Sequence, residues 1–487
     1  MPPTFGPPTF ESNRAACEHG PVSTDTVDSI SVGKAEATSV GKTDNISTAK
    51  VDLISTGKAG SISVAKICVV IFAVSFLLFA VSPEGRLEAL SVPFGGESVR
   101  VARSLAETGT FANPFVVLKT GETAHVAPVY PALYAVVLRL LGDSYTALVV
   151  LWALNLSFLS LQMALLPWLS LRLNLGLLPG VLAAALGAVS LHTAVDTHWE
   201  CFLAGALLLG AFLLTNDRLS AAKAGVAGVL WGVLVLTNPV AVLLLLAWPI
   251  VYLARERKNR AQLARRFALL AATAAMVVFP WVLRDHARLG SWMFVRDNLG
   301  LELYSGNNPC AKPTLQENID NGCNAATHPN SGAAVAAQLA AVGEVRFSRA
   351  KFRQALQWIT ANPSNFLALT CGRIREFWFP SLDNRWEMFS AWGVTLLSLA
   401  GIWILFRDNS CAGWLIALAW LLFPAIYYLV PAEPRYGYPV YWTTLLAAGL
   451  PVAHALRSIQ ARLALRKVQP YAASQHGKHA DSSLRSE

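Results

Sequence analysis

Charged residues are scarce in this chain. Aspartate, glutamate, lysine and arginine make up 14% of its 487 residues, whereas hydrophobic residues make up 54%. Soluble domains carry roughly 25% charged residues. The few charges gather in short stretches and leave long apolar runs between them, and a helical run of about 20 residues matches the hydrocarbon core of a bilayer. This composition excludes a soluble globular protein and predicts an all-α polytopic membrane protein.

Metal-type cysteine spacing is also missing. None of the seven cysteines forms a CxxC pair, so the cysteines do not predict a metal site. Cys310 and Cys323 lie in one polar loop that we place on the outer side of the membrane. They are therefore candidates for a disulfide in an oxidising compartment.

The net charge of +9 does not indicate a nucleic-acid partner. The basic residues lie beside apolar segments, as in the clusters from Arg255 to Arg266 and from Arg457 to Lys467. Such a distribution is typical of the cytoplasmic loops of membrane proteins, which carry an excess of lysine and arginine. Membrane lipids, and no nucleic acid, are the expected surroundings.

The first 65 residues lack helical periodicity. An imperfect repeat of eight residues places five lysines there at constant spacing: Lys34, Lys42, Lys50, Lys58 and Lys66. Repeats this short and polar cannot bury a core, so residues 1–65 are predicted to form a disordered tail. The membrane domain is expected over 66–457, and a basic cytoplasmic tail over 458–487.

About ten apolar segments are expected to span the membrane. Alternation across the bilayer then puts every short loop with lysine or arginine on the cytoplasmic side, together with both termini. The break at Asn238 and Pro239 is the boundary on which this depends most, because one kinked helix there would invert the topology downstream. The expected spans are 67–81, 144–169, 177–193, 200–215, 222–237, 239–254, 267–283, 389–406, 412–430 and 438–456.

Two large outer loops are expected, over 83–143 and 284–388. Residues 128–141 are apolar but too short to span, which predicts a helix in the membrane interface with Tyr130 and Tyr134 as interfacial aromatics. Residues 343–363 place apolar side chains at helical spacing with arginines between them. This pattern predicts an amphipathic helix.

The first group of candidate functional residues is Glu97 with Arg100 and Arg103. Two glycines precede Glu97 in FGGESVRVARSLAETG. This predicts a helix with the carboxylate near its start, where the helix dipole favours negative charge, facing Arg100 one turn on. A purely local ion pair would explain the pattern as well.

The second group is His192, Asp196 and Glu200, where the third expected span ends and the fourth begins. In a helix these side chains would share one face. Acidic groups at the mouth of a membrane bundle are costly unless they are partnered or functional. A metal site here would need further ligands, so no metal ligand is assigned.

The third group consists of arginines near the outer face. Arg284, Arg296 and Arg435, the last beside Tyr436, suit an anionic lipid phosphate, because guanidinium matches phosphate oxygens in geometry. Contacts with ordinary lipid headgroups are the alternative.

Three stretches, taken in order, resemble one family. GESVRVARSLAETGTFANPF with HVAPVYPALYAVVLRLLG is similar to its first outer loop. PWVLRDHARLGSWMFVRDNLGLELYSGNN is similar to its arginine-containing segment, and PAEPRYGYPVYWTTLLAAG to the start of its last helix. The family is the membrane glycosyltransferases of the GT-C fold, in the branch of the protein O-mannosyltransferases and the bacterial aminoarabinose transferase (glycosyltransferase family 39). The resemblance spans most of residues 67–456.

The resemblance implies a polyprenyl-phosphate-linked sugar donor and an active site on the outer face of a bacterial inner membrane. Glu97 stands where the family's first outer loop carries an acidic residue, usually aspartate. The second acidic position of the family falls on Asp196 or Glu200, of which we favour Asp196. Arg284 carries over, but its neighbours read Arg-Asp-His where the family usually has Arg-Asn-Tyr.

These residue types suit sugar transfer. A carboxylate can take the proton of an acceptor hydroxyl or orient that hydroxyl, and arginine can stabilise a leaving phosphate. We expect an inverting glycosyltransferase that acts on a lipid, glycan or protein acceptor. The alternatives are a polymerase or ligase of lipid-linked glycans and a non-enzymatic transporter or scaffold. The expected catalytic residues are Glu97 and Asp196, and the expected substrate contacts are Arg100, Glu200, Arg284, Arg296, Arg435 and Tyr436.

No cofactor is assigned from the sequence. A divalent cation, Mg²⁺ or Mn²⁺, remains open, because Glu97 and Asp196 would have to approach each other to share it.

Overall fold

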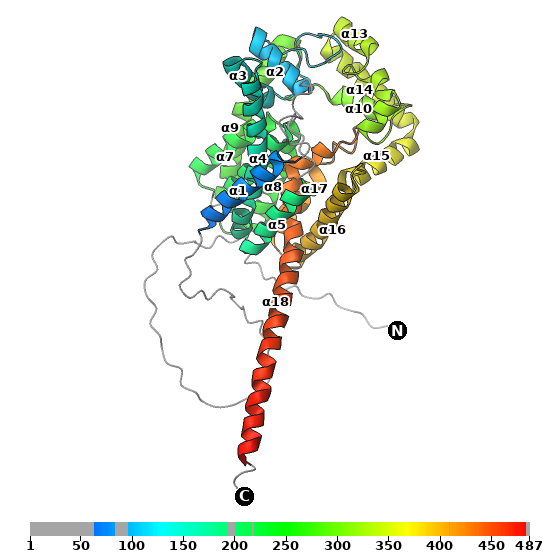
Figure 1. The fold of residues 1–487 in the computed structure, drawn as a ribbon. Coiled ribbons are helices and arrows are strands. Elements are labelled where there is room, and N and C mark those ends of the chain that lie inside the picture. Colours follow the sequence, from blue (N-terminus) through cyan, green and yellow to red (C-terminus); the bar gives the residue numbers. More distant parts are fainter. Residues whose placement is uncertain (1–62, 83–95, 192–199, 217–218, 409, 484–487) are drawn as a thin grey trace, which may run out of the picture.

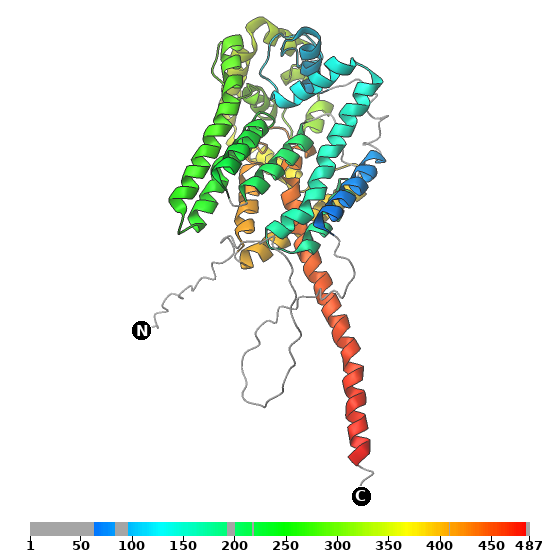
Figure 2. The same cartoon turned by 90° about the vertical axis from the view of Figure 1, so that its left-hand side faces the viewer.

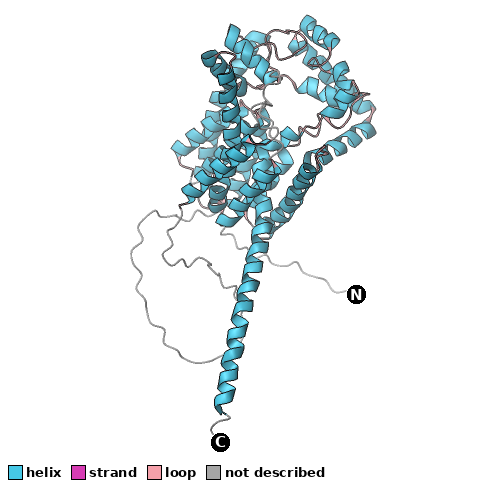
Figure 3. Ribbon diagram, in the orientation of Figure 1, coloured by secondary structure: helices cyan, strands magenta, loops and turns pink. Residues whose placement is uncertain are grey.

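The protein is helical throughout the part that the structure describes. The structure, a computed structural model, describes residues 63–82, 96–191, 200–216, 219–408 and 410–483, with side chains through residue 463. These ranges hold eighteen α-helices and no strand, only two isolated bridges (Figure 3). The all-α fold class predicted from the sequence is confirmed. The expected tail up to residue 62 and Asp196 lie outside the described residues.

Ten helices form the apolar bundle. They are α1 (Val64–Ala80), α4 (Tyr145–Arg172), α5 (Leu177–Ser190), α6 (Cys201–Thr215), α7 (Ala221–Val235), α8 (Val242–Arg255), α9 (Arg260–Leu289), α16 (Arg385–Arg407), α17 (Cys411–Leu422) and α18 (Tyr438–Ser483). Among the described residues, α4, α9 and α16 are each long and apolar enough to cross a membrane by themselves, and most of the others are shorter apolar helices.

Two boundaries in the bundle bear on the expected spans. The span expected over 412–430 is too long: α17 ends at Leu422, one residue before Phe423 and Pro424. Proline has no N–H to continue the helical ladder, so the chain turns there. The break at Asn238 is present. The helix α7 ends at Val235, and the Asn238 side chain accepts from the Val240 N–H at the start of a short 3-10 helix, η3 (Pro239–Ala241).

Glycines bring the bundle helices together. Gly228 and Gly232 stand one turn apart on α7, and a Cβ atom at either position would meet a carbonyl oxygen of α9, that of Leu270 at 2.5 Å and that of Ala274 at 2.9 Å. Gly401 of α16 lies as close to α18, where a Cβ would meet the Ala447 carbonyl oxygen at 1.8 Å. Small residues at four-residue spacing allow such close approach in membrane helices.

The remaining eight helices form an outer layer at one end of the bundle. They are α2 (Glu97–Thr108), α3 (Val129–Leu141), α10 (Leu299–Gly306), α11 (Leu315–Asp320), α12 (Cys323–Thr327), α13 (Ala333–Val342), α14 (Glu344–Ala361) and α15 (Pro363–Trp378). Figures 1 and 2 show most of this layer gathered at the upper end, with α18 extending from the opposite end. The layer comes from both expected outer loops.

The helix α3 differs from the expectation for its aromatics. Tyr130 and Tyr134 are almost completely buried instead of lying at an interface. The Tyr130 hydroxyl bonds to the Tyr134 hydroxyl at 2.6 Å and donates to Asn155 Oδ1 of α4 at 3.2 Å. A buried amide on α4 gives both hydroxyls a partner, which makes their burial favourable. These contacts fix α3 on the bundle.

Cys310 and Cys323 are joined by a disulfide in the structure. The residues between them include α11, whose N-terminus carries a capping box between Thr314 and Glu317. The bridge fixes the start of α12, and His328 follows directly after that helix. The disulfide thus constrains the segment that leads to the candidate site.

Candidate active site

Glu97 begins α2, as the sequence predicts. Its predecessor Gly96 is extended, with φ −71° and ψ 146°, and caps the helix. The carboxylate therefore lies at the positive end of the helix dipole. Val99 and Ala102 of the same helix are buried against Tyr130 and its neighbours on α3. This packing sets the direction of the Glu97 side chain, which is only 12% exposed.

His125 reaches Glu97 because the first outer loop folds back on itself. An isolated bridge pairs Ala112 with Glu122, and the Thr123 N–H donates to the Phe111 carbonyl at 3.1 Å. The segment that returns after this bridge places His125 Nε2 at 3.2 Å from Glu97 Oε2. The imidazole is 2% exposed, so this pair is withdrawn from bulk water.

Glu344, at the start of α14, anchors the same loop. It accepts from the Ala124 N–H at 2.7 Å and from the Thr123 hydroxyl. Arg296 adds a bond from its Nε to the His125 carbonyl at 2.9 Å. The second outer segment thus holds residues 123–125 of the first in position through two side chains, Glu344 and Arg296.

His328 joins the pair from the middle of the second outer segment, directly after α12. Its ring lies 6.1 Å from that of His125, and both rings meet Phe115 edge-on. Its Nε2 lies 3.8 Å from Glu302 Oε1 of α10. These contacts connect four ionisable side chains, hereafter called the row: Glu97 with His125, His125 with His328, and His328 with Glu302.

The electrostatics of the row follow from burial and pairing. Burial by itself would raise the pKa of Glu97, but His125, His328 and Arg435 together hold that pKa well below its usual range. Burial would also raise the pKa of Glu302, but His328 outweighs it and lowers that pKa. Burial opposes protonation of His328, yet Glu302 and Glu97 raise its pKa. Both carboxylates are ionised at neutral pH.

Glu97, His125 and His328 could hold a cation. One ligand atom from each lies within 4.8 Å of the other two. Two imidazole nitrogens and one carboxylate oxygen suit Zn²⁺ or Mn²⁺ better than Mg²⁺, which prefers oxygen ligands. The Asn330 N–H donates to His328 Nδ1 at 3.1 Å, so the neutral ring carries its proton on Nε2. A cation at Nε2 replaces that proton, which makes binding dependent on pH.

Arg435 and Tyr436 lie at this site. Both belong to the 3-10 helix η4 (Pro434–Gly437), just before α18. Arg435 Nε is 2.7 Å from Glu433 Oε2, and its guanidinium lies 5.5 Å from the centre of the Tyr436 ring. Because Arg435 contributes to the lowered pKa of Glu97, the start of the last helix faces the start of α2.

Two other predicted contacts brace loops. Arg284 donates to the Thr123 carbonyl at 2.8 Å and to the Phe111 carbonyl at 3.1 Å, and stacks on Phe111 and Trp281. The charge of Arg100 interacts with that of Glu97: burial lowers the pKa of Arg100, and Glu97 opposes this effect. Arg100 donates to the Pro114 carbonyl at 2.6 Å and to Asn330 Oδ1 at 2.8 Å.

Glu200 lies beside the loop that carries His125. It precedes α6, and its Oε1 is 3.8 Å from Arg296 Nη1. Among the residues expected at the site, the structure thus brings together Glu97, Arg435 and Tyr436, with Arg296 and Glu200 next to them. Asp196 lies outside the described residues.

His328 was missed by sequence reasoning, and His125 and Glu302 were noted without a role. His328 lies in an irregular loop, more than 200 residues after Glu97 in the sequence. No periodicity marks it. The only local signal is the neighbouring cysteine pair, which indicates a constrained loop.

Comparison with known proteins finds likeness at the level of structure. No family model and no curated protein matches the sequence. The oligosaccharyltransferase of Archaeoglobus fulgidus in its apo form aligns with a TM-score of 0.50 at 13% identity, over 82% of this chain and 52% of that one. Its complex with Zn and sulfate aligns with a TM-score of 0.50 at 13% identity, over 82% of this chain and 51% of that one. The form tethered to an acceptor peptide with the NVT sequon aligns with a TM-score of 0.51 at 14% identity, over 82% of this chain and 50% of that one.

This chain spans about half the length of the oligosaccharyltransferase that it matches. At such low identity the likeness establishes the fold and not the substrates. The protein has the GT-C fold of membrane glycosyltransferases, as the sequence predicts.

Proposed function

We propose that the protein is an integral-membrane glycosyltransferase that moves a sugar from a polyprenyl-phosphate donor to an acceptor hydroxyl on the outer face of the membrane. One observation carries this proposal: the buried, ionised Glu97, paired with His125 beside His328, at the outer end of a GT-C bundle. Buried charges are costly and are retained where they are paired or serve chemistry.

The chemistry assigns different tasks to the row of side chains. The acceptor hydroxyl oxygen attacks the anomeric carbon, and the hydroxyl proton passes to the phosphate that leaves. The bond from that carbon to the phosphate oxygen breaks, and the phosphate leaves with the electron pair. Attack from the opposite side inverts the configuration. Arg435 is placed to stabilise the leaving phosphate, as guanidinium does for developing charge.

The lowered pKa of Glu97 bears on its role. A general base works best when its pKa lies near the working pH. A carboxylate held far below that is a weak base but a good acceptor of hydrogen bonds and a good ligand. Glu97 therefore orients the acceptor hydroxyl and helps to hold a cation, instead of removing the proton by its own basicity.

A divalent cation at Glu97, His125 and His328 would supply a Lewis acid that offsets charge on the phosphate. The donor set fits such an ion, with Mn²⁺ or Zn²⁺ favoured over Mg²⁺. The structure of the Archaeoglobus fulgidus enzyme with Zn and sulfate gives a precedent for a cation and an anion on this fold.

The topology belongs to the same proposal. We place residues 66–457 as the transferase domain in a bacterial inner membrane, with the tails 1–65 and 458–487 in the cytoplasm. The segregation of basic residues supports this orientation. The disulfide supports it as well, because it lies in the outer layer, where an oxidising compartment is required.

The decisive experiment is transfer by the purified protein in lipid nanodiscs. Labelled sugars on polyprenyl phosphate are offered together with extracts that contain lipid, glycan and protein acceptors. Nucleotide sugars serve as the control donors. The proposal expects label in an acceptor only with lipid-linked donors. Absence of transfer with every lipid-linked donor, or equal transfer from nucleotide sugars, contradicts it.

A further inference from the structure

Two adjoining cavities lie between α10 and α14. The first has a volume of about 570 Å³ and is lined by charged side chains, among them Arg296, Asp297, Arg349 and Arg353. The second has a volume of about 320 Å³ and is lined only by apolar residues. Both include Leu299 and Phe352 in their walls. Together they form one groove, hereafter the amphipathic groove, with a cationic end and an apolar end.

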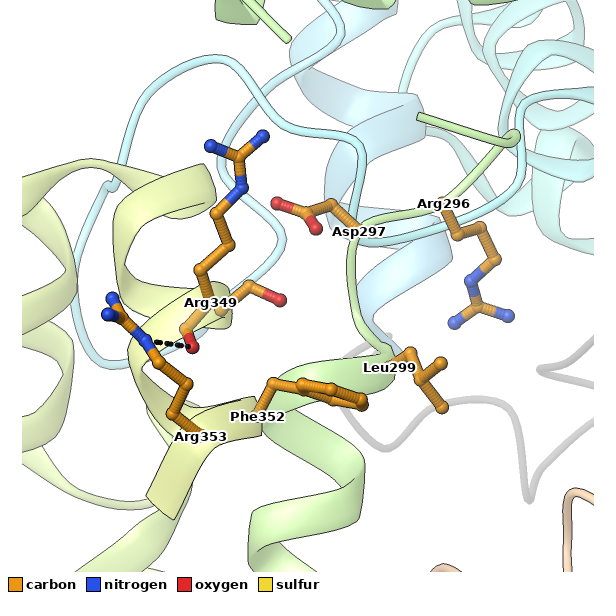
Figure 4. A pocket seen from close by; sticks show the side chains of 8 residues that line it. Arg296, Asp297, Leu299, Arg349, Phe352 and Arg353 are labelled. Atoms are coloured by element: carbon orange, nitrogen blue, oxygen red, sulfur yellow. Dashed lines mark hydrogen bonds between the residues drawn. The ribbon is translucent and has the colours of Figure 1, made fainter. Parts of the chain in front are cut away.

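The cationic end has arginines on both walls. Arg349 and Arg353 stand four residues apart and therefore share one face of α14, while Arg296 and Asp297 come from the segment before α10 (Figure 4). Arg349 Nη2 donates to Ser291 Oγ at 2.5 Å, and Arg353 Nε donates to the Arg349 carbonyl at 3.4 Å. The other guanidinium N–H groups are available, and their planar fork suits a phosphate.

Asp297 does not cancel this positive charge at neutral pH. Burial, and then the nearby Glu344, raise the pKa of Asp297 to about 7. The carboxyl is thus only partly ionised where the three arginines are fully charged. The cationic end keeps a net attraction for an anion.

The apolar end holds hydrophobic side chains that water would otherwise meet. Phe352, Leu356 and Leu299 are 36%, 43% and 45% exposed. The opposite wall is formed by Ile426 and Leu429, in the segment between α17 and η4. These apolar side chains suit contact with a hydrocarbon chain.

The walls of the groove are held at a fixed separation. A Cβ at Gly300 would lie 2.1 Å from the Ser348 carbonyl oxygen, so α10 and α14 touch through their backbones. The buried Lys351 ammonium of α14 lies 4.3 Å from the centre of the Tyr304 ring of α10. The groove is therefore preformed, which lowers the cost of binding.

The groove leads to the candidate active site. Arg296 lines its cationic end and also donates to the His125 carbonyl. The Asp297 N–H donates to the Ala124 carbonyl at 2.9 Å. Any group attached to an anion at Arg349 and Arg353 on the side of Arg296 would thus point toward His125 and Glu97.

We propose that the amphipathic groove binds the lipid-phosphate donor, with the phosphate on Arg349 and Arg353 and the first isoprenoid units against Phe352 and Leu356. The identity of the ligand as the sugar donor rests on the proposed function. That the ligand carries one phosphate on one hydrocarbon chain is inferred from the groove itself, because one cationic end adjoins one apolar end. Arg349 and Arg353 then hold the phosphate from the side of the groove, in addition to Arg435 at the active site, where the sequence pointed to Arg284 and Arg435.

Binding is tested by native mass spectrometry of the full chain in detergent, titrated with polyprenyl phosphate. Polyprenol without phosphate, inorganic phosphate and phosphatidylglycerol are titrated in parallel. Polyprenyl phosphate is expected to bind at least about tenfold more tightly than the other three, because it alone fills both ends of the groove. Phosphatidylglycerol that binds as tightly and displaces polyprenyl phosphate would make this a bilayer-lipid site and overturn the proposal.

The variants are Arg353→Gln alone and Arg349→Gln with Arg353→Gln. Arg346→Gln is the matched control, since Arg346 is an exposed arginine of the same helix that does not line the groove. Affinity for polyprenyl phosphate should fall about tenfold or more in the double variant, less in the single variant, and stay unchanged in the control. If the double variant binds polyprenyl phosphate as tightly as the wild type does, the proposed phosphate site in the amphipathic groove is refuted. Among the described residues Arg353 makes only one weak bond, so its single variant tests the phosphate contact even where the double variant folds poorly.

Failure of the groove and failure of the proposed function give different results. If the double variant transfers sugar with an unchanged KM for the donor, the groove is refuted and the function stands. If the wild-type chain binds polyprenyl phosphate through these arginines but moves no sugar, the groove stands and the function is refuted.

Discussion

The apolar bundle and the outer layer are stabilised in different ways. In the bundle, helices meet through backbone contacts at small residues such as Gly228, Gly232 and Gly401. In the outer layer, charged side chains from different loops and helices pair with one another, as Glu97 does with His125 and His328 with Glu302. Lipid gives no hydrophobic drive between helices, so shape decides there. The outer layer can hold charges because it pairs them, and the candidate active site lies there.

Changing Gly401 should break the bundle. Gly401→Val places a side chain where a Cβ would already lie 1.8 Å from the Ala447 carbonyl oxygen, so α16 and α18 must separate. Overpacking of this kind costs about 1 to 3 kcal/mol or more. We expect loss of most folded protein, measured as the monodisperse fraction after purification.

Gly393→Val on the same helix is the matched control. A Cβ at Gly393 meets nothing within 4 Å. Its yield should equal that of the wild type. Equal losses in both variants would mean that valine disturbs α16 by itself and that the close contact with α18 contributes little to the stability of the fold.

Removing His125 should break the outer layer by a different route. His125→Ala leaves the Glu97 carboxylate buried without its hydrogen-bond partner, and removing one member of a buried pair costs about 3 to 5 kcal/mol. The thermal unfolding midpoint should fall markedly. His286→Ala removes an exposed imidazole that stacks on Trp292, and should lower the midpoint little. Similar midpoints for the two variants would contradict a paired charge at Glu97.

The same contrast explains what the sequence could and could not predict. The bundle follows from apolar runs, and Glu97 at a helix start follows from the two glycines before it, because these signals are local. The pairing of Glu97 with His125 and His328 depends on a loop that folds back and on a segment more than 200 residues away. Arg284 shows the converse. Its place after an apolar helix suggested a substrate contact, yet its guanidinium is bound to the carbonyls of the first loop.

Some of the groove was within reach of the sequence. Residues 344–361 form the amphipathic helix that their periodicity predicts, and Arg346, Arg349 and Arg353 fall on neighbouring turns. Which of these arginines faces a cavity depends on how α14 lies on α10. The contact of Gly300 with Ser348 sets that arrangement, and no local pattern announces it.

Cation binding should stabilise the outer layer by a smaller amount. At a concentration of Zn²⁺ or Mn²⁺ 100 times its Kd, binding to the folded state alone adds about 2.7 kcal/mol. Chelation followed by addition of either ion should raise the unfolding midpoint of the wild type but not that of His328→Ala. An equal rise in both would place the ion elsewhere in the molecule.

A separate expected effect is a dependence of stability on pH at Asp297. Burial and Glu344 raise its folded pKa to about 7, while Ser348, Arg349 and His125 oppose the rise. The folded state therefore holds a proton that the unfolded state has released above about pH 4. Stability must fall as the pH rises from about 4 to 7. Asp297→Asn should be more stable than the wild type above pH 7 and similar below pH 4, and parallel curves of midpoint against pH would contradict this assignment.

The most direct test is sugar transfer by Glu97→Gln measured beside Glu107→Gln. Both residues lie on α2, but Glu107 is exposed at the far end of the helix. Glutamine keeps the size of the side chain and removes the charge that His125 and His328 pair with. We predict that Glu97→Gln folds, inserts and loses about 100-fold or more of its transfer rate, while Glu107→Gln transfers as the wild type does. Equal transfer rates in the two variants would show that the buried carboxylate is not part of the active site.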